Sequence, residues 1–545
     1  MNKPWLFVLT LLFVSAVSAQ HGHMVDDETP PPFNATGDEP MSYALFPAQH
    51  GYFYAHVAFM VVAFWVLMPI GIMLGIARSS FHVPTQLASF SLALFGYFFG
   101  QMYGHSTPHL YKGNVHHSLG WVLFVFFLAQ SAVGIVRKIA NAVGKTQEST
   151  YDRLETVHLV NRPSSSSSSD HHSDASMETL RHHVDEDENE QGFLYDKQSG
   201  VSSEEKPSWT MRAFNVVSPY IPKLIKTAFV AVAYNPFTKT ACRWFHLLLG
   251  RVFIVLIFTQ TVSGMVVYHG VCRSWDVLGC TAHLIKGGIF FFYGTLTFAR
   301  YLGAFADRGW AWNRADGASR FSFEMVESSL IFVYGITNTW MEHFGQDSKW
   351  EHKDLEHASL AFMWWWCGLI GILVESRALR RLLERSVLGT STEVPRHETK
   401  QTQSLNPFPA LTVLMTGISM GNHHQDTQYS SNIHYMWGVL LSCAAVCRFM
   451  TYITLYRRPP KDAQPTRPPT EIVGAFFLIA GSILFMASNS GTLMWLRRNQ
   501  VDSMFLMNVC VALTAMTLSY VATMMIIKAW AMKREQKKIV GRSPY

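Results

Sequence analysis

The chain has 545 residues, of which 49% are hydrophobic and only 15% are charged. This composition is too apolar for a typical soluble protein of that length. The formal net charge is +6, yet the sequence holds no basic stripe interleaved with aromatic residues. We therefore expect membrane lipid, and not nucleic acid, as its partner.

Residues 1–19 have the pattern of a secretory signal peptide. Lys3 gives the positive start, an apolar stretch follows, and small residues ending at Ala19 form a cleavage site. A short first transmembrane helix is the alternative. The polar segment 20–49 is then expected on the luminal or extracellular side. Asn34, in the sequence Asn-Ala-Thr, is a predicted glycosylation site.

Apolar runs follow along the rest of the chain, most of them near the ~20 residues that a bilayer-spanning helix needs. They predict an all-α fold, a polytopic transmembrane helical bundle of about eleven spans. The run at 407–421 is short and contains Pro409, so the count is open by one. The runs cover residues 52–77, 84–103, 117–137, 244–268, 284–304, 322–343, 358–378, 407–421, 435–456, 471–496 and 503–532.

Basic residues gather after alternate spans. If segment 20–49 lies outside the cytosol, alternation places these groups in the cytosol, as the positive-inside rule predicts. We therefore expect an integral protein of a secretory-pathway membrane (plasma membrane, vacuole or endomembrane) with a cytosolic tail at 536–545. The groups are Arg78, Arg137-Lys138, Arg300, Arg308, Arg314, Arg377, Arg380-Arg381, Arg457-Arg458, Lys533-Arg534 and Lys537-Lys538.

A long polar linker at 146–208 divides the chain. It contains a serine run that starts at Ser164, an acidic stretch and few apolar residues, so it cannot bury enough surface to fold. We expect it to be disordered and cytosolic, where kinases are candidate partners for its serines. The predicted membrane domains on either side are residues 50–145 and 209–535.

Two cysteines differ from the other five, which lie in or beside apolar runs. Cys272 and Cys280 flank a short loop that the predicted orientation places outside the cytosol. An oxidising compartment favours a disulfide between them, and two free thiols are the alternative.

Histidines recur at both ends of the hairpins that face away from the cytosol. A single histidine at a helix end needs no function, but the repeat is systematic. Neutral imidazole is a common ligand for haem iron, copper and zinc, so the pattern favours cofactor or metal binding. The pairs are His105 with His116-His117, His269 with His283, His343 with His357, and His423-His424 with His434.

Three sequence motifs resemble the cytochrome b561 core. They are His56-Val57-Ala58-Phe59-Met60, the pair His116 and Gly120, and Trp244-Phe245-His246-Leu247-Leu248-Leu249-Gly250-Arg251. Together with the serine-rich linker and the helices that follow it, the chain resembles the fungal Ytp-type integral membrane proteins. Those proteins combine a b561-like N-terminal region with a larger C-terminal membrane domain.

The resemblance implies four core helices that hold two haems b and pass single electrons across the membrane. His56 and His116 are the implied ligands of one haem, near the non-cytosolic face. His246 requires a cytosolic-side partner, but Thr85 stands where the family has its histidine. His82 lies one turn earlier and precedes Pro84, which favours a loop. The sequence therefore supports one haem and leaves the second dependent on His82.

The C-terminal domain holds a second set of histidines, namely His343, His357, His423 and His434. They are candidate ligands for a further haem or a transition metal, or members of a polar cap with neighbouring acidic residues. Glu324 and Glu327 stand near a helix end, where a side chain can reach the interface.

The leading hypothesis is a haem-b oxidoreductase component that delivers electrons to ferric or cupric ion outside the cytosol. The sequence identifies neither the electron donor nor the natural acceptor. The alternative is a non-enzymatic protein that binds or senses a transition metal, or a structural membrane scaffold.

Overall fold

The computed structural model describes residues 42–46, 49–111, 113–134, 235–273, 277–314, 321–341, 350, 352–388 and 404–540. The predicted signal peptide, Asn34, the linker at 146–208 and His343 lie outside these ranges. Helices account for nearly all regular structure, and the described ranges contain no β-strand. The predicted all-α class is therefore confirmed.

Contacts divide the chain into two compact units, and each is considered by itself. Unit 1 comprises residues 1–113 and 264–545, and unit 2 comprises residues 114–263. The division falls within one long helix and does not follow the linker. The domain boundaries expected at 145 and 209 therefore stay predictions.

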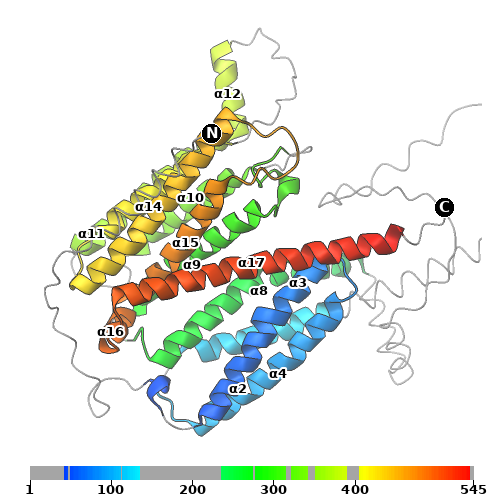
Figure 1. Ribbon diagram of the computed structural model, residues 1–545, viewed down its shortest axis with the longest axis vertical. Helices are drawn as coiled ribbons and strands as arrows, with labels where there is room; N and C mark the ends of the chain where they lie inside the picture. The colour runs from blue at the N-terminus through cyan, green and yellow to red at the C-terminus, as the bar shows by residue number, and fades with distance from the viewer. Residues whose placement is uncertain are drawn as a thin grey trace, which may run out of the picture. The chain divides into compact units, whose positions relative to one another are not determined.

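Unit 1 begins with an antiparallel helical hairpin (Figure 1). Its first arm is one continuous helix made of α2 (His50–Val61), a π-helical turn η2 (Val62–Leu67) and α3 (Met68–Ile76). Its second arm is α4 (His82–Ser106). Arg78 has a positive φ of 54° in the short turn between the arms. A short 3-10 helix, η1 (Tyr43–Leu45), precedes the hairpin.

The rest of unit 1 is a larger helical bundle built around α14 and α15. In the most apolar window of each helix, 56% of α14 and 67% of α15 is buried, against 28% of α9 and 22% of α11. Trp437 and Leu484 are fully enclosed in the core between them. The helices are α9 (Val277–Tyr301), α10 (Phe323–Met341), α11 (His352–Glu375), α12 (Arg377–Leu388), α13 (Phe408–Gly421), α14 (Gln428–Arg457), α15 (Pro469–Ala487), α16 (Ser490–Arg498) and α17 (Ser503–Val540).

The last helix, α17, joins this bundle to the N-terminal hairpin. It crosses α3 in Figure 1, and the Tyr520 hydroxyl donates a hydrogen bond to the Trp65 carbonyl at 2.8 Å. Ala531 packs against Leu74 in a small apolar cluster. The helix continues to Val540, so the first part of the tail predicted at 536–545 is helical.

Unit 2 contains the helix Val115–Gly134 and most of α8 (Pro236–His269). Two glutamines tie these helices together. Gln130 Nε2 donates to the His246 carbonyl at 3.0 Å, and Gln260 Nε2 donates to the His116 carbonyl at 2.9 Å. Each polar side chain thus finds its partner within the helix pair, as a low-dielectric environment requires.

Every predicted apolar run lies on a helix, but the number of spans differs from the prediction. Eight helices in the described ranges are long and apolar enough to cross a membrane. α13 has only 14 residues, and α4 and α10 are less apolar. The run at 471–496 is two helices, because α15 ends at Ala487 and Asn489 caps α16 through the Thr492 amide. The count of about eleven is not confirmed.

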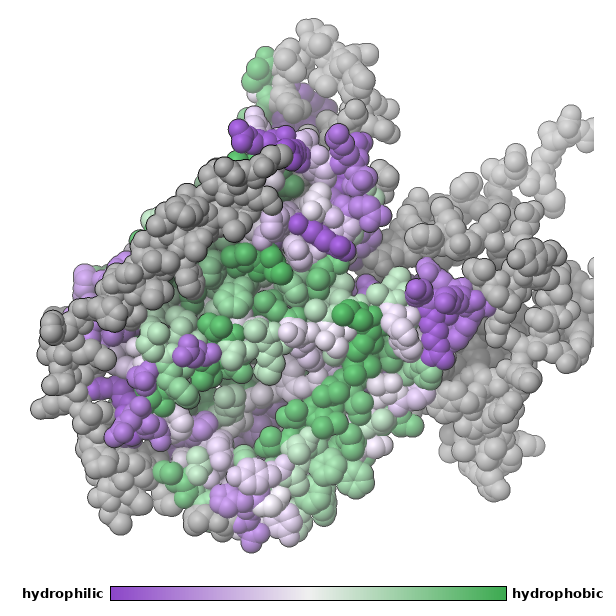
Figure 2. Space-filling view, viewed as in Figure 1, coloured by the Kyte–Doolittle hydropathy of each residue, from purple (hydrophilic) through white to green (hydrophobic). Residues whose placement is uncertain are grey.

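Apolar side chains cover much of the face shown in Figure 2, including the middle of α17. Many large ones are strongly exposed, for example Met516 at 62% and Ile526 at 67%. Hydrophilic side chains gather at the end of α17, where Lys533, Lys537 and Lys538 lie. An apolar belt with polar ends is typical of a helix surface that faces lipid.

Two glycines set the closest helix contact, between α10 and α11. A Cβ on Gly368 would lie 2.4 Å from the Phe332 amide nitrogen, and one on Gly335 would lie 2.2 Å from the Trp365 nitrogen. Gly368→Ala should therefore force the helices apart and lower the free energy of unfolding by ~1–3 kcal/mol.

Thermal unfolding of the purified protein in detergent would measure this effect. Gly104→Ala in α4 is the control, since a Cβ there meets nothing within 4 Å and alanine favours the helix by up to ~1 kcal/mol. A Gly368→Ala protein as stable as the Gly104→Ala protein would contradict the prediction.

Candidate functional site

His56, on α2, is held by the opposite arm of the N-terminal hairpin. Its Nδ1 lies 2.8 Å from the Gly96 carbonyl oxygen. Because a carbonyl only accepts, Nδ1 carries the hydrogen and Nε2 keeps its lone pair. The ring lies against Gly100, where a Cβ would be 2.7 Å from Nδ1. A ring oriented in this way has the form of a metal-ligating histidine with its supporting hydrogen bond.

His82 makes the same arrangement at the other end of the hairpin. Its Nδ1 lies 2.7 Å from the Gly71 carbonyl oxygen, and a Cβ on Gly75 would be 2.8 Å from that nitrogen. The expectation that His82 lies in a loop is wrong, because α4 begins at His82. Pro84 falls in the first turn, where an amide hydrogen has no intrahelical acceptor to lose.

The two arms therefore carry a reciprocal pattern of histidine and glycine. In α4, Gly96 and Gly100 follow His82 by 14 and 18 residues. In the first arm, Gly71 and Gly75 follow His56 by 15 and 19 residues, and the π-helical turn η2 accommodates the additional residue. At 1.5 Å per residue, 18 residues span about 27 Å, so each arm brings its histidine and its glycines to opposite ends of a membrane-length hairpin.

Unit 2 repeats this spacing. Gln130 and Gly134 follow His116 by 14 and 18 residues, and Gln260 follows His246 by 14. His116 Nδ1 lies 3.1 Å from the Gln260 carbonyl oxygen. A Cβ on Gly134 would be 3.6 Å from the His246 ring. Four helices thus present a histidine ring over a small residue or a carbonyl group of a neighbouring helix.

The four candidate haem ligands are divided between the units. His56 and His82 belong to unit 1, and His116 and His246 belong to unit 2. The pairing of His56 with His116, and of His82 with His246, therefore stays a prediction.

The histidines of the C-terminal bundle form two pairs. The His357 and His423 ring centroids are 5.2 Å apart, and His423 Nδ1 contacts a carboxylate oxygen of Glu356. His434 lies beside His283, with centroids 6.1 Å apart. His283 was not among the predicted ligands, although it opens α9 in the histidine repeat. No three His, Cys, Asp or Glu side chains in the described ranges are arranged to hold a metal ion.

Cys272 and Cys280 are joined by a disulfide, with their Cα atoms 5.6 Å apart. The bond closes the short connection between α8 and α9. The Tyr111 hydroxyl donates to the Cys272 carbonyl at 2.7 Å, and the Arg273 guanidinium donates to the Leu110 carbonyl at 3.0 Å. The disulfide thus stabilises a loop that also packs on the end of the N-terminal segment of unit 1.

Glu324 and Glu327 do not reach an interface. Each is only 6% exposed and lies within the bundle. Arg300, Arg448 and Glu471 are buried with them, and the sequence interpretation overlooked these three residues. Arg448 carried the clearest signal, because a charge in the middle of an apolar run marks a functional candidate.

Comparison with known proteins identifies relatives along most of the chain. The family described as "Protein YTP1-like, C-terminal" matches residues 256–529, and a domain family of unknown function, DUF2427, matches residues 38–140. An uncharacterized membrane protein of Schizosaccharomyces pombe is 35% identical over 533 residues, which cover 92% of this chain and 99% of that relative.

Two proteins of Saccharomyces cerevisiae are also similar. An uncharacterized membrane protein is 33% identical over 314 residues (54% of this chain and 49% of the relative), and protein YTP1 is 25% identical over 233 residues (43% of each). No solved structure matches the chain. The apolar helices and these relatives together establish that the chain belongs to the YTP1-like family of membrane proteins.

Proposed function

We propose that this protein binds haem b and passes single electrons to an acceptor, such as ferric or cupric ion, at the non-cytosolic face of a secretory-pathway membrane. The observation that carries the proposal is the repeated spacing of histidine and small residue on four helices. Two histidines, His56 and His82, have Nδ1 bonded to a carbonyl and a glycine beneath the ring. This arrangement leaves Nε2 as a ligand atom.

The residues present fit two haems with histidine at both axial positions. His56 and His116 would hold one, and His82 and His246 the other. When bound, haem iron supplies reversible one-electron transfer, with a potential that depends on its axial ligands and their hydrogen bonds. The chain itself orients the imidazoles through carbonyls such as that of Gly96, and glycines such as Gly100 leave room for the rings.

Absorption spectroscopy of the purified full chain tests this proposal. The reduced-minus-oxidised spectrum should show the sharp α and Soret bands of bis-histidine haem b. His116→Ala should remove about half of the signal, because one of two haems loses a ligand. His357→Ala, in the C-terminal bundle, is the matched control and should leave the spectrum unchanged. A spectrum without haem bands would exclude the proposed function.

A second candidate function is non-enzymatic binding or sensing of a transition metal. The contact of His423 with Glu356, and the nearby ring of His357, favour it. His343 would complete the predicted set together with His434. Metal analysis of haem-free protein, with His423→Ala as the variant, distinguishes this function, and a protein without haem or metal would be left as a structural scaffold.

A further inference from the structure

Five charged side chains are buried together where α9, α10, α14 and α15 meet. They are only 1–6% exposed, which is unusual for charged groups unless they have a partner or a function. We call them the Arg–Glu network. Its members are Arg300, Glu324, Glu327, Arg448 and Glu471.

The network is centred on Arg448. Its Nε lies 2.8 Å from Glu471 Oε1, and its NH1 lies 3.4 Å from Glu327 Oε1. Arg300 NH1 is 3.9 Å from the same Glu327 oxygen. Arg300 is held mainly by other contacts, since its Nε donates to the Trp310 carbonyl at 2.6 Å and its guanidinium lies 3.6 Å from the Phe323 ring centroid.

Two loops close this end of the bundle. One follows α9 and the other connects α14 to α15. Asn313 Nδ2 donates to the Ala463 carbonyl at 2.7 Å, and the Thr466 hydroxyl donates to the Trp312 carbonyl at 2.8 Å. Trp312 is itself 2% exposed and lies over Arg300. The network is therefore enclosed by protein, which makes any unbalanced charge in it costly.

The charges do not balance when all five groups are ionised. Two guanidinium groups face three carboxylates, so the network carries one excess negative charge. Arg448 is shared by Glu471 and Glu327, and Glu324 makes no ion pair within 4 Å with any side chain in the part of the chain that the structure describes. Burial of an uncompensated carboxylate costs several kcal/mol, roughly, and binding of a cation removes that cost.

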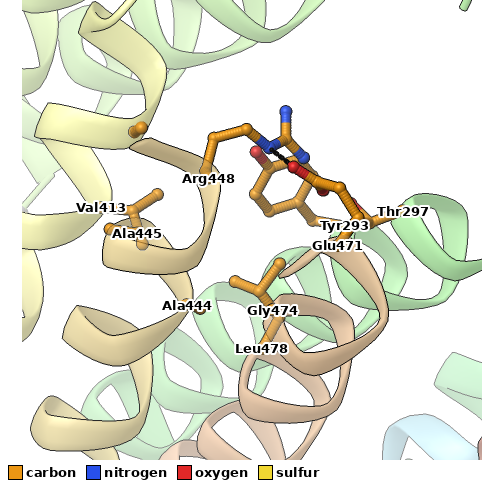
Figure 3. A pocket seen from close by; sticks show the side chains of 10 residues that line it. Tyr293, Thr297, Val413, Ala444, Ala445, Arg448, Glu471, Gly474 and Leu478 are labelled. Atoms are coloured by element: carbon orange, nitrogen blue, oxygen red, sulfur yellow. Dashed lines mark ion pairs between the residues drawn. The ribbon is translucent and has the colours of Figure 1, made fainter. Parts of the chain in front are cut away.

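A small cavity lies beside the network (Figure 3). Arg448, Glu471, Tyr293 and Thr297 line it, together with small apolar residues. The Thr297 hydroxyl is enclosed, at 1% exposure for the residue, and has no hydrogen-bond partner among the described side chains. The cavity has room for about one water-sized ligand, which excludes a hydrated metal ion.

We propose that the Arg–Glu network is a binding site for one exchangeable proton. The proton adds to the Glu324 carboxylate, and the network changes from one excess negative charge to neutrality. Bulk water supplies the proton and takes it back. The charged and titratable groups that face Glu324 are Glu327 on α10, Tyr293 and Arg300 on α9, Tyr452 and Arg448 on α14, and Glu471 on α15. This site is independent of the histidines that would hold haem.

Difference infrared spectroscopy of the full chain in lipid nanodiscs, between neutral and alkaline pH, tests the proposal. The carbonyl stretching band of a protonated carboxylic acid should be present at neutral pH and lost in Glu324→Gln. Glu375→Gln is the matched control. Glu375 is also buried, at 8% exposure, but its carboxylate accepts hydrogen bonds from Ser322 and Ser404. Its substitution should leave the band unchanged.

Glu471→Gln gives a second test that keeps Glu324 in place. It makes the network neutral without a proton, so the band should also be lost at neutral pH. A band that persists in Glu324→Gln overturns the proposal. An unfolding temperature that rises with NaCl but not with choline chloride, in a wild-type protein without the band, would instead assign the site to Na⁺ and would also overturn it.

Discussion

Replacement of His82 with alanine should remove about half of the haem absorbance of the purified protein, whereas Thr85→Ala should leave it unchanged. His82 is the first residue of α4, and its Nδ1 hydrogen bond to the Gly71 carbonyl matches that of His56 to Gly96. Thr85 lies in the first turn, where its amide donates to the Phe81 carbonyl at 3.1 Å. It has the family position in the sequence alignment of motifs but not the ring that a ligand needs.

Three further proteins make this test decisive. His56→Ala should remove the other half of the signal, and the double variant of His56 and His82 should retain no haem. His105→Ala, at the end of α4, is a control for loss of a histidine from the same hairpin. A His82→Ala protein with the full wild-type absorbance would show that the protein holds its haem without this residue.

The helices could be predicted from the sequence because hydropathy alone determines where an apolar chain crosses a membrane. Their ends could not. α8 begins at Pro236, before its apolar part, because Thr238 to Arg243 continue the helix as a polar first section. The break between α15 and α16 depends on Ser488 and Asn489, two polar residues that are lost in the average over a long apolar run.

The candidate site was predicted in part. His56, His116 and His246 follow from short motifs, but the shared spacing to glycine was obscured by the π-helical turn, which shifts the first arm by one residue. His82 was assigned to a loop because the effect of a proline on the preceding residue is a tendency that a first helical turn can override. The Arg–Glu network required tertiary structure, since its members come from four helices far apart in sequence.

Arg448→Met should be among the most destabilising single substitutions in the C-terminal bundle. Removal of the guanidinium leaves the carboxylates of Glu471 and Glu327 buried without their principal cation. Loss of one partner from a buried ion pair costs ~3–5 kcal/mol. Denaturant unfolding of the purified protein in detergent micelles would measure the change. Arg380→Met is the control, because Arg380 is 48% exposed and its ion pair with Glu375 should contribute ~1 kcal/mol or less.

The double variant of Arg448→Met and Glu471→Leu separates the pair from its environment. Because it removes both members of the 2.8 Å ion pair and fills their space with apolar side chains, much of the lost stability should return. Additive losses would mean that Glu471 contributes through contacts other than Arg448. A recovery would instead show that the pair is not needed for folding. The network would then be maintained for its charge, as a proton-binding site in the membrane domain requires.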